Sequence, residues 1–202
     1  MFRDSLVNVA RSTLRIVLRL SKSLSSSDCL NREDKSSTAE VTEGFSPRTV
    51  SSRLNISLRS LTNVTVIGQH PDVFCAAVMR NPVISAGELC TSDIPDWALR
   101  EFGFSFEPGT HVTPEIFSAL HAASPIAHVA RVKAPVLILL GEDDLRVPPT
   151  QGRGYYHVLK GMGRVVELLV FPKETHPIDG VEAARVAFEA GRDWFRTFTQ
   201  EK

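Results

Sequence analysis

The run APVLILLG at residues 134–141 is eight residues long and contains no charged or hydrogen-bonding side chain. A continuous apolar run of this kind is typical of a central parallel strand that is buried on both faces. Two further runs predict buried strands, FCAAVMRNPV at residues 74–83, which ends in Asn-Pro, and RVVELLVFP at residues 164–172. The chain therefore has to supply helices that cover both faces of a parallel sheet.

Segments with helical signals lie between and after these runs. DIPDWALREFG begins with an acidic residue and a proline and ends in glycine, and TPEIFSALHAAS offers Thr113 as an N-cap. PTQGRGYYHVLKGMG predicts a helix that is closed by Gly161 or Gly163. IDGVEAARVAFEAGRDWFRTFTQ predicts a terminal helix, with the apolar residues Val181, Ala184, Val186, Phe188, Trp194 and Phe198. Alternating strands and helices predict an α/β fold, a parallel sheet flanked by helices with right-handed crossovers.

Composition and charge narrow the class of protein. The chain has 202 residues and a formal net charge of zero, so its overall charge gives no reason to expect nucleic acid as a partner. No apolar run approaches the length of about 20 residues that a membrane-spanning helix needs, so no membrane partner is expected. Three cysteines without a Cys-x-x-Cys pair favour a reduced, intracellular protein.

The N-terminal third differs from the rest of the chain. Residues 1–60 contain 10 Lys and Arg, 6 Asp and Glu and 14 Ser, with little sustained apolar periodicity. We therefore predict a disordered or atypical segment at residues 1–65 and a folded part at residues 66–202. Residues 1–20 place apolar residues near one helical face and Arg11, Arg15 and Arg19 in another row. This pattern is typical of a mitochondrial or plastid transit peptide, or of a basic helix without a targeting role.

An acid and a histidine follow two of the predicted strands. Asp143 and Asp144 come directly after VLILLG, and His176 comes shortly after VVELLVF. Functional groups gather at the carboxyl ends of parallel strands, where an acid can orient an imidazole that acts as a general base. The alternatives are a solvated acidic loop and a loop histidine. No further carboxylates fall at metal-loop spacing, so neither a metal nor another cofactor is expected.

Several stretches together resemble one peptidase family. HPDVFCAAVMRNPV, SDIPDW, SPIAHVARVKAPVLILLGEDDLRVPPTQGRGYYHVLKGMG and VVELLVFPKETHPI are similar, in order and spacing, to the C-terminal part of acylaminoacyl-peptidases. These belong to the prolyl oligopeptidase family of serine peptidases, which have the α/β-hydrolase fold. The resemblance covers about residues 66–200, and implies an incomplete α/β-hydrolase fold.

The resemblance also implies a reaction. Its G-x-x-D-x-R-V-P loop puts the catalytic acid on Asp144 and its P-K-x-T-H loop puts the catalytic base on His176. The implied substrate is an N-acylated peptide, from whose end the acylated residue is released through an acyl-enzyme on serine. The family also implies a cytoplasmic location and a homo-oligomer. Arg80, at a strand's carboxyl end, lines the substrate pocket or makes a structural salt bridge.

The nucleophile of such an enzyme is missing from the sequence. α/β-Hydrolases carry their serine in a Gly-x-Ser-x-Gly turn between a strand and a helix, and no such motif occurs here. With one choice of codons, residues 38–49 read in another frame as Gly-Gly-Ser-His-Gly-Gly-Phe-Leu-Thr-Thr-His, the family's own turn. Residues 1–49 would then come from a shifted frame, and residues 50–66 from an insertion that restores the frame.

We therefore interpret the chain as a serine-type peptidase homologue that keeps Asp144 and His176 and is inactive without its nucleophile. One alternative is a non-catalytic protein that associates with a full-length peptidase. Another is a different α/β-hydrolase, such as an esterase, with a serine recruited from elsewhere. Three structural roles are also expected. Trp97 packs in the core or at a lid, Arg146 braces the acid loop, and Tyr155 and Tyr156 pack a helix onto the sheet.

Overall fold

The computed structural model describes residues 54–58 and 61–199 of the chain. The described residues form one parallel sheet in the order β1-β2-β3-β4. Its strands are β1 (Leu54–Leu58), β2 (Phe74–Arg80), β3 (Val136–Gly141) and β4 (Val166–Phe171). β2, β3 and β4 are the three strands that the apolar runs predict. Every residue of β3 is buried, as expected of a strand between two neighbours with both faces covered.

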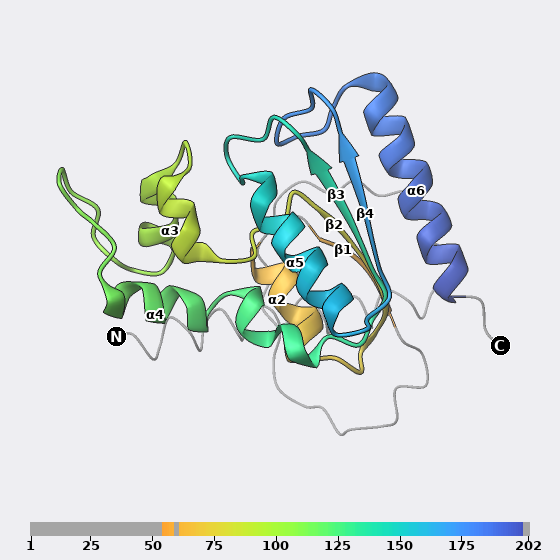
Figure 1. Ribbon diagram of the computed structural model, residues 1–202, viewed down its shortest axis with the longest axis horizontal. Coiled ribbons are helices and arrows are strands. Elements are labelled where there is room, and N and C mark those ends of the chain that lie inside the picture. The colour runs from red at the N-terminus through yellow and green to blue at the C-terminus, as the bar shows by residue number, and fades with distance from the viewer. Residues whose placement is uncertain (1–53, 59–60, 200–202) are drawn as a thin grey trace, which may run out of the picture. The chain divides into compact units, whose positions relative to one another are not determined.

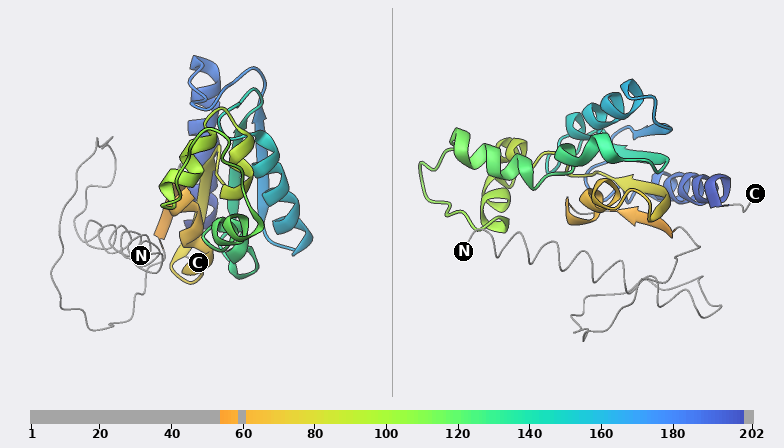
Figure 2. Two further views of the ribbon diagram at one scale, coloured as in Figure 1. Left: turned by 90° about the vertical axis from the view of Figure 1, so that its left-hand side faces the viewer. Right: turned by 90° about the horizontal axis from the view of Figure 1, so that it is seen from below.

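Helices join these parallel strands and cover the two faces of the sheet. They are α2 (Leu61–Gln69), α3 (Pro95–Glu101), α4 (Pro114–Ala122), α5 (Pro149–Gly161) and α6 (Val181–Thr199), with the 3-10 helices η1 (Ala86–Thr91) and η2 (Pro125–Arg131). α6 lies along one face and contacts β2 and β3, whereas α2 and α5 lie on the other face, where both contact η2 (Figures 1 and 2). The α/β prediction is confirmed.

Regular structure begins before residue 66. β1 pairs with β2 in parallel, with Ser57 opposite Val78, and α2 already starts at Leu61. The predicted boundary between residues 65 and 66 therefore falls inside a helix, because α2 continues without interruption from Leu61 to Gln69. The basic face at residues 1–20 and the alternative frame at residues 38–49 lie outside the described residues. Among the described residues, no helix is long and apolar enough to cross a membrane.

One prediction of burial was wrong. β4 is largely half-buried or exposed rather than buried, because it forms an edge of the four-stranded sheet. In α6, only Ala187, Gly191 and Trp194 are buried, whereas Val181 and Phe188 are exposed by 90% and 71%. The buried residues recur every three or four positions and form the stripe that faces the sheet, and Val181 and Phe188 lie off that stripe.

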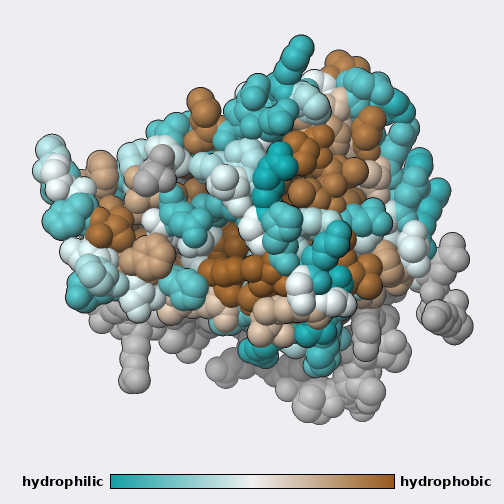
Figure 3. All heavy atoms as spheres, in the orientation of Figure 1, coloured by the Kyte–Doolittle hydropathy of each residue, from teal (hydrophilic) through white to brown (hydrophobic). Residues whose placement is uncertain are grey.

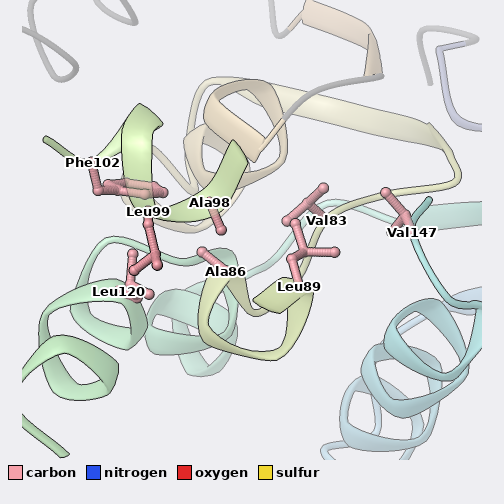
Figure 4. Packing of buried hydrophobic residues seen from close by; sticks show 8 residues of the cluster. All are labelled: Val83, Ala86, Leu89, Ala98, Leu99, Phe102, Leu120 and Val147. Carbon is pink, nitrogen blue, oxygen red and sulfur yellow. The ribbon is translucent and has the colours of Figure 1, made fainter. Parts of the chain in front are cut away.

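The segment between β2 and β3 has a small core of its own. In Figure 4, Leu99 of α3 and Phe102, the C-cap of that helix, pack toward Leu120 of α4. Ala86 and Leu89 of η1 lie beside them. Trp97 is partly buried against this cluster, as a core role predicts. Hydrophobic residues also reach the surface between hydrophilic ones on the face of Figure 3, which is normal for folded proteins. This segment contacts the loop of residues 142–148, which joins β3 to α5, carries Asp144 and is called the acid loop here.

Replacement of Thr113 by alanine should lower the free energy of unfolding by about 1 kcal/mol, the usual value of an N-cap side chain. The Thr113 hydroxyl accepts a hydrogen bond from the Ile116 N–H at 3.3 Å, and Pro114 occupies the first helical position. Urea unfolding of Thr113→Ala and of the control Thr113→Ser measures the difference. Serine keeps the acceptor, so an equal loss of stability in both variants would contradict the capping role.

The free energy of unfolding should fall as the pH falls below 6.5, because two histidines are held neutral. Burial, followed by the positive charge of Arg131, lowers the pKa of His70 and of His128 from the ordinary value of 6.5. The unfolded chain therefore binds protons first, and the stability present above pH 6.5 is lost as the pH drops through the folded values. Urea unfolding between about pH 7.5 and 5.5 measures this loss. A variant with both histidines changed to glutamine should lose less, and an equal loss would refute the assignment.

Candidate active site

The acid and the histidine meet at the carboxyl edge of the sheet. Asp144 follows β3 and His176 follows β4, and the two strands are parallel neighbours, so their following loops lie together. His176 Nδ1 lies 2.8 Å from Asp144 Oδ2, within hydrogen-bond distance. The Asp144 side chain is fully buried, and the His176 side chain is 36% exposed. The pair has the arrangement in which a carboxylate orients an imidazole.

Asp144, rather than Asp143, is the buried aspartate that bonds to His176. Its second carboxylate oxygen, Oδ1, accepts hydrogen bonds from the backbone N–H groups of Arg146 and Val147, each at 2.9 Å. Both oxygens of this buried carboxylate therefore have partners, which offsets the cost of burying the charge. Asp143 is exposed, and its backbone N–H donates to the Glu174 carbonyl at 2.9 Å. The two neighbouring aspartates thus have different structural roles.

The imidazole has one nitrogen committed and one free for chemistry. With Nδ1–H donated to the Asp144 carboxylate, Nε2 is left unprotonated in the neutral ring and can accept a proton. Among the residues that the structure describes, no hydrogen bond engages Nε2. The hydroxyls of Ser92 and Ser124 bond within their own segments, to Ile94 N–H, Ala86 N–H and the Leu120 carbonyl. The described pair is therefore an acid and a base, without a serine bonded to it.

Arg80 lies against the loop that carries the histidine. Its guanidinium Nη1 donates to the Pro177 carbonyl at 3.3 Å, across the carboxyl edge from β2 to the residue after His176. Arg80 therefore reaches the candidate site, and its substrate-binding role stays a prediction. A nearby residue that sequence reasoning missed is Asn81, whose side chain bonds to the His176 carbonyl at 2.7 Å. Its only sequence signal was an Asn-Pro pair, which indicates the end of a strand.

The acid loop is braced from the segment after β2. Arg146 Nη2 lies 3.5 Å from Asp93 Oδ2, and the Asp93 N–H donates to the Leu145 carbonyl at 3.3 Å. The brace that was expected of Arg146 is present, although the side chains are 52% and 40% exposed and such a pair stabilises little. On α5, Tyr155 is fully buried, and burial raises its pKa, whereas Tyr156 is half-buried beside Lys160.

A separate cavity of about 990 Å³ lies within the segment between β2 and β3. Its walls include Leu99, Phe106 and Phe117 and the polar residues His111 and His121, and neither Asp144 nor His176 lines it. Among the described residues, no group of three or more His, Cys, Asp or Glu side chains could hold a metal ion. The cavity is therefore separate from the acid–histidine pair.

Comparison with known families identifies the class of this pair. The model of the prolyl oligopeptidase family matches residues 60–202. The chain belongs to the prolyl oligopeptidase family. This is a family of serine peptidases, and an acid paired with a histidine is the arrangement by which serine peptidases activate their nucleophile. The match begins one residue before α2 and includes β2, β3, β4 and both loops of the pair.

Curated relatives narrow the likeness further. The pig acylamino-acid-releasing enzyme (Sus scrofa) is 41% identical over 133 residues, which are 65% of this chain and 18% of the relative. The enzyme of the same name from Arabidopsis thaliana is 40% identical over 138 residues, 66% of this chain and 18% of the relative. The chain thus spans about a fifth of the length of the curated relatives that it matches. The peptidase resemblance is confirmed.

Solved structures agree in fold. An uncomplexed acylaminoacyl peptidase from Pyrococcus horikoshii superposes with a TM-score of 0.62 at 22% identity, over 74% of this chain and 24% of that one. A puromycin-hydrolyzing peptidase from Mycobacterium tuberculosis gives a TM-score of 0.58 at 26% identity, over 74% of this chain and 22% of that one. The sheet and its covering helices are therefore those of the acylaminoacyl-peptidase hydrolase fold.

Proposed function

We propose that this chain supplies the acid and the base of an acylaminoacyl peptidase, and that by itself it forms no acyl-enzyme. The contact of His176 Nδ1 with Asp144 Oδ2 at 2.8 Å carries the proposal. The carboxylate holds the imidazole in the Nδ1–H tautomer and stabilises the imidazolium that forms when Nε2 takes a proton. The names of the curated relatives support an N-acylated peptide as the substrate class.

The second half of the proposal rests on the sequence. Acyl transfer needs a nucleophile whose proton Nε2 removes, together with a backbone N–H that stabilises the oxyanion. Both are supplied in α/β-hydrolases by the Gly-x-Ser-x-Gly turn, which this sequence lacks. The acid and base are then present without the group that they activate. Association with a full-length peptidase would be one way to use them.

The role of the pair can be tested in a chimaera that supplies a nucleophile from a related enzyme. The 133 residues of the pig enzyme that match this chain are replaced by those of this chain. The chimaera keeps any nucleophile that lies in the pig sequence outside the exchanged part. We expect it to hydrolyse an N-acetyl-alanyl arylamide, and Asp144→Asn should lower kcat by about 10⁴-fold, as loss of the correct histidine tautomer does elsewhere.

Asp143→Asn is the matched control, because it removes the same charge from the adjacent, exposed position. It should leave kcat close to that of the unmodified chimaera. A folded chimaera that hydrolyses nothing, or one in which the two asparagine variants have equal kcat, would overturn the proposed role of Asp144 and His176. Circular dichroism and a urea titration establish that each protein is folded.

A further inference from the structure

Asn81 occupies an unusual backbone position directly beside the acid–histidine pair. It is the first residue after β2, it is 1% exposed, and its φ is +41°. Left-handed backbone is uncommon for residues other than glycine, and asparagine is among those that adopt it most readily. Its N–H donates to the Leu139 carbonyl of β3 at 2.9 Å, so the backbone at this turn is tied to the centre of the sheet.

The side-chain amide of Asn81 joins three segments. Its Oδ1 accepts a hydrogen bond from the Gly141 N–H at the end of β3, at 2.9 Å. Its Nδ2 donates to the His176 carbonyl at 2.7 Å and to the Thr175 carbonyl at 3.4 Å. The orientation of the amide is fixed by these partners, because an N–H faces its oxygen and carbonyls face its nitrogen.

These contacts belong to a row of bonds along the histidine loop. The Glu174 carbonyl accepts from the Asp143 N–H at 2.9 Å, and the Pro177 carbonyl accepts from Arg80 Nη1 at 3.3 Å. With the two bonds from Asn81, every carbonyl from residue 174 to residue 177 accepts a hydrogen bond from the end of β2, from the residue directly after it, or from the acid loop. Asn81 makes the shortest of these bonds, and makes it to the carbonyl of the histidine itself.

We propose that Asn81 is a positioning residue for His176. Its side-chain amide ties the backbone of His176 to the end of β3, and Asp144 lies in the loop that follows β3. The amide therefore sets the distance between His176 Nδ1 and the Asp144 carboxylate. This inference rests on the proposed function, since it assigns Asn81 to the same acid–histidine pair. Asn81 contacts neither a substrate nor a reacting atom in this role and acts through His176.

Gln151 provides a matched control, because it is also a buried amide that bonds to backbone. Its Oε1 accepts from the N–H groups of Ile84 and Ser85 at 2.8 and 3.0 Å, and its Nε2 donates to the Ser85 carbonyl at 3.2 Å. It is 5% exposed and makes none of its bonds to the histidine loop. If Asn81 affected His176 only through the general stability of the fold, loss of either side-chain amide should change the environment of His176 to the same extent.

The test records the Nδ1–H proton signal of His176 by NMR in the full 202-residue chain with ¹⁵N-labelled histidine. A proton held between Nδ1 and a buried carboxylate resonates far downfield, and its loss in His176→Gln assigns it. Asn81→Gly keeps the left-handed backbone and removes the amide. Asn81→Asp keeps the acceptor for Gly141 and loses the donor to His176. Gln151→Ala is measured in parallel.

We expect the signal to be lost, or shifted upfield, in both Asn81 variants and to be unchanged in Gln151→Ala. An unchanged signal in either folded Asn81 variant, or an equal change in Gln151→Ala, would overturn the inference. Because the spectrum requires no turnover, it is independent of the chimaera. An inactive chimaera counts against the proposed function alone. A His176 Nδ1–H signal that is unchanged in the Asn81 variants counts against this inference alone.

Discussion

Asp144→Ala should lower the free energy of unfolding by about 2–4 kcal/mol, because a buried hydrogen-bonding group that loses its partner typically costs about 1–3 kcal/mol. The substitution removes a fully buried carboxylate that accepts three hydrogen bonds, from the N–H groups of Arg146 and Val147 and from the ring of His176. Without this acceptor the Val147 N–H would remain buried and the Arg146 N–H part-buried, and such groups are costly to leave unpaired. Urea unfolding followed by circular dichroism measures the loss.

Two substitutions serve as controls for Asp144→Ala. Asp144→Asn keeps an oxygen for the two backbone donors and should cost clearly less than alanine. Asp143→Ala changes an exposed neighbour and should stay within about 0.5 kcal/mol of the unmodified chain, as surface substitutions usually do. If Asp143→Ala cost as much as Asp144→Ala, the buried acceptor would not be the source of the stability.

Gly141→Ala should destabilise the fold at the upper end of the range of about 1–3 kcal/mol that is typical of overpacking, or beyond it. A Cβ at residue 141 would lie 2.6 Å from the Glu174 carbonyl oxygen and still closer to that of Thr175. Both atoms are backbone and are held by other bonds, so the loop with His176 would have to move. The downfield Nδ1–H signal of His176 should therefore be lost together with the stability.

Gly152→Ala distinguishes this collision from a generic effect of added volume. A Cβ at residue 152 would meet Leu140 Cδ2 at 2.5 Å, the end of a flexible side chain that can turn away. The cost should be smaller than for Gly141→Ala, and the His176 signal should remain. A Gly141→Ala protein with normal stability and an intact His176 signal would show that the loop is not held where these contacts place it.

The parts of this fold that the sequence predicts are those set by local pattern. β3 and α5 follow from a continuous apolar run and from a proline–glycine frame around a helix, and both lie where the pattern puts them. Asp144 and His176 were found because polar groups after neighbouring parallel strands must share one edge of the sheet. The choice of Asp144 over Asp143 came from the resemblance, and the burial of Asp144 agrees with it.

What the sequence did not predict depends on contacts between distant segments. Asn81 bonds to residues more than 50 positions away, and no local pattern shows that three strand ends will bring these groups together. Which face of α6 is buried depends on distant contacts in the same way. Phe188 is apolar in sequence, but the stripe that meets the sheet is decided by how the helix docks onto β2 and β3.

The most direct test of the proposed function is labelling of the purified chain with a fluorophosphonate, which reacts with a serine only when a base activates it. A full-length acylamino-acid-releasing enzyme provides the positive control. We expect no label on this chain, because its sequence contains no Gly-x-Ser-x-Gly motif whose serine the proposed pair could activate. Stoichiometric labelling that is abolished by His176→Gln and by the change of one serine would contradict this expectation, and would establish the chain as a complete serine hydrolase.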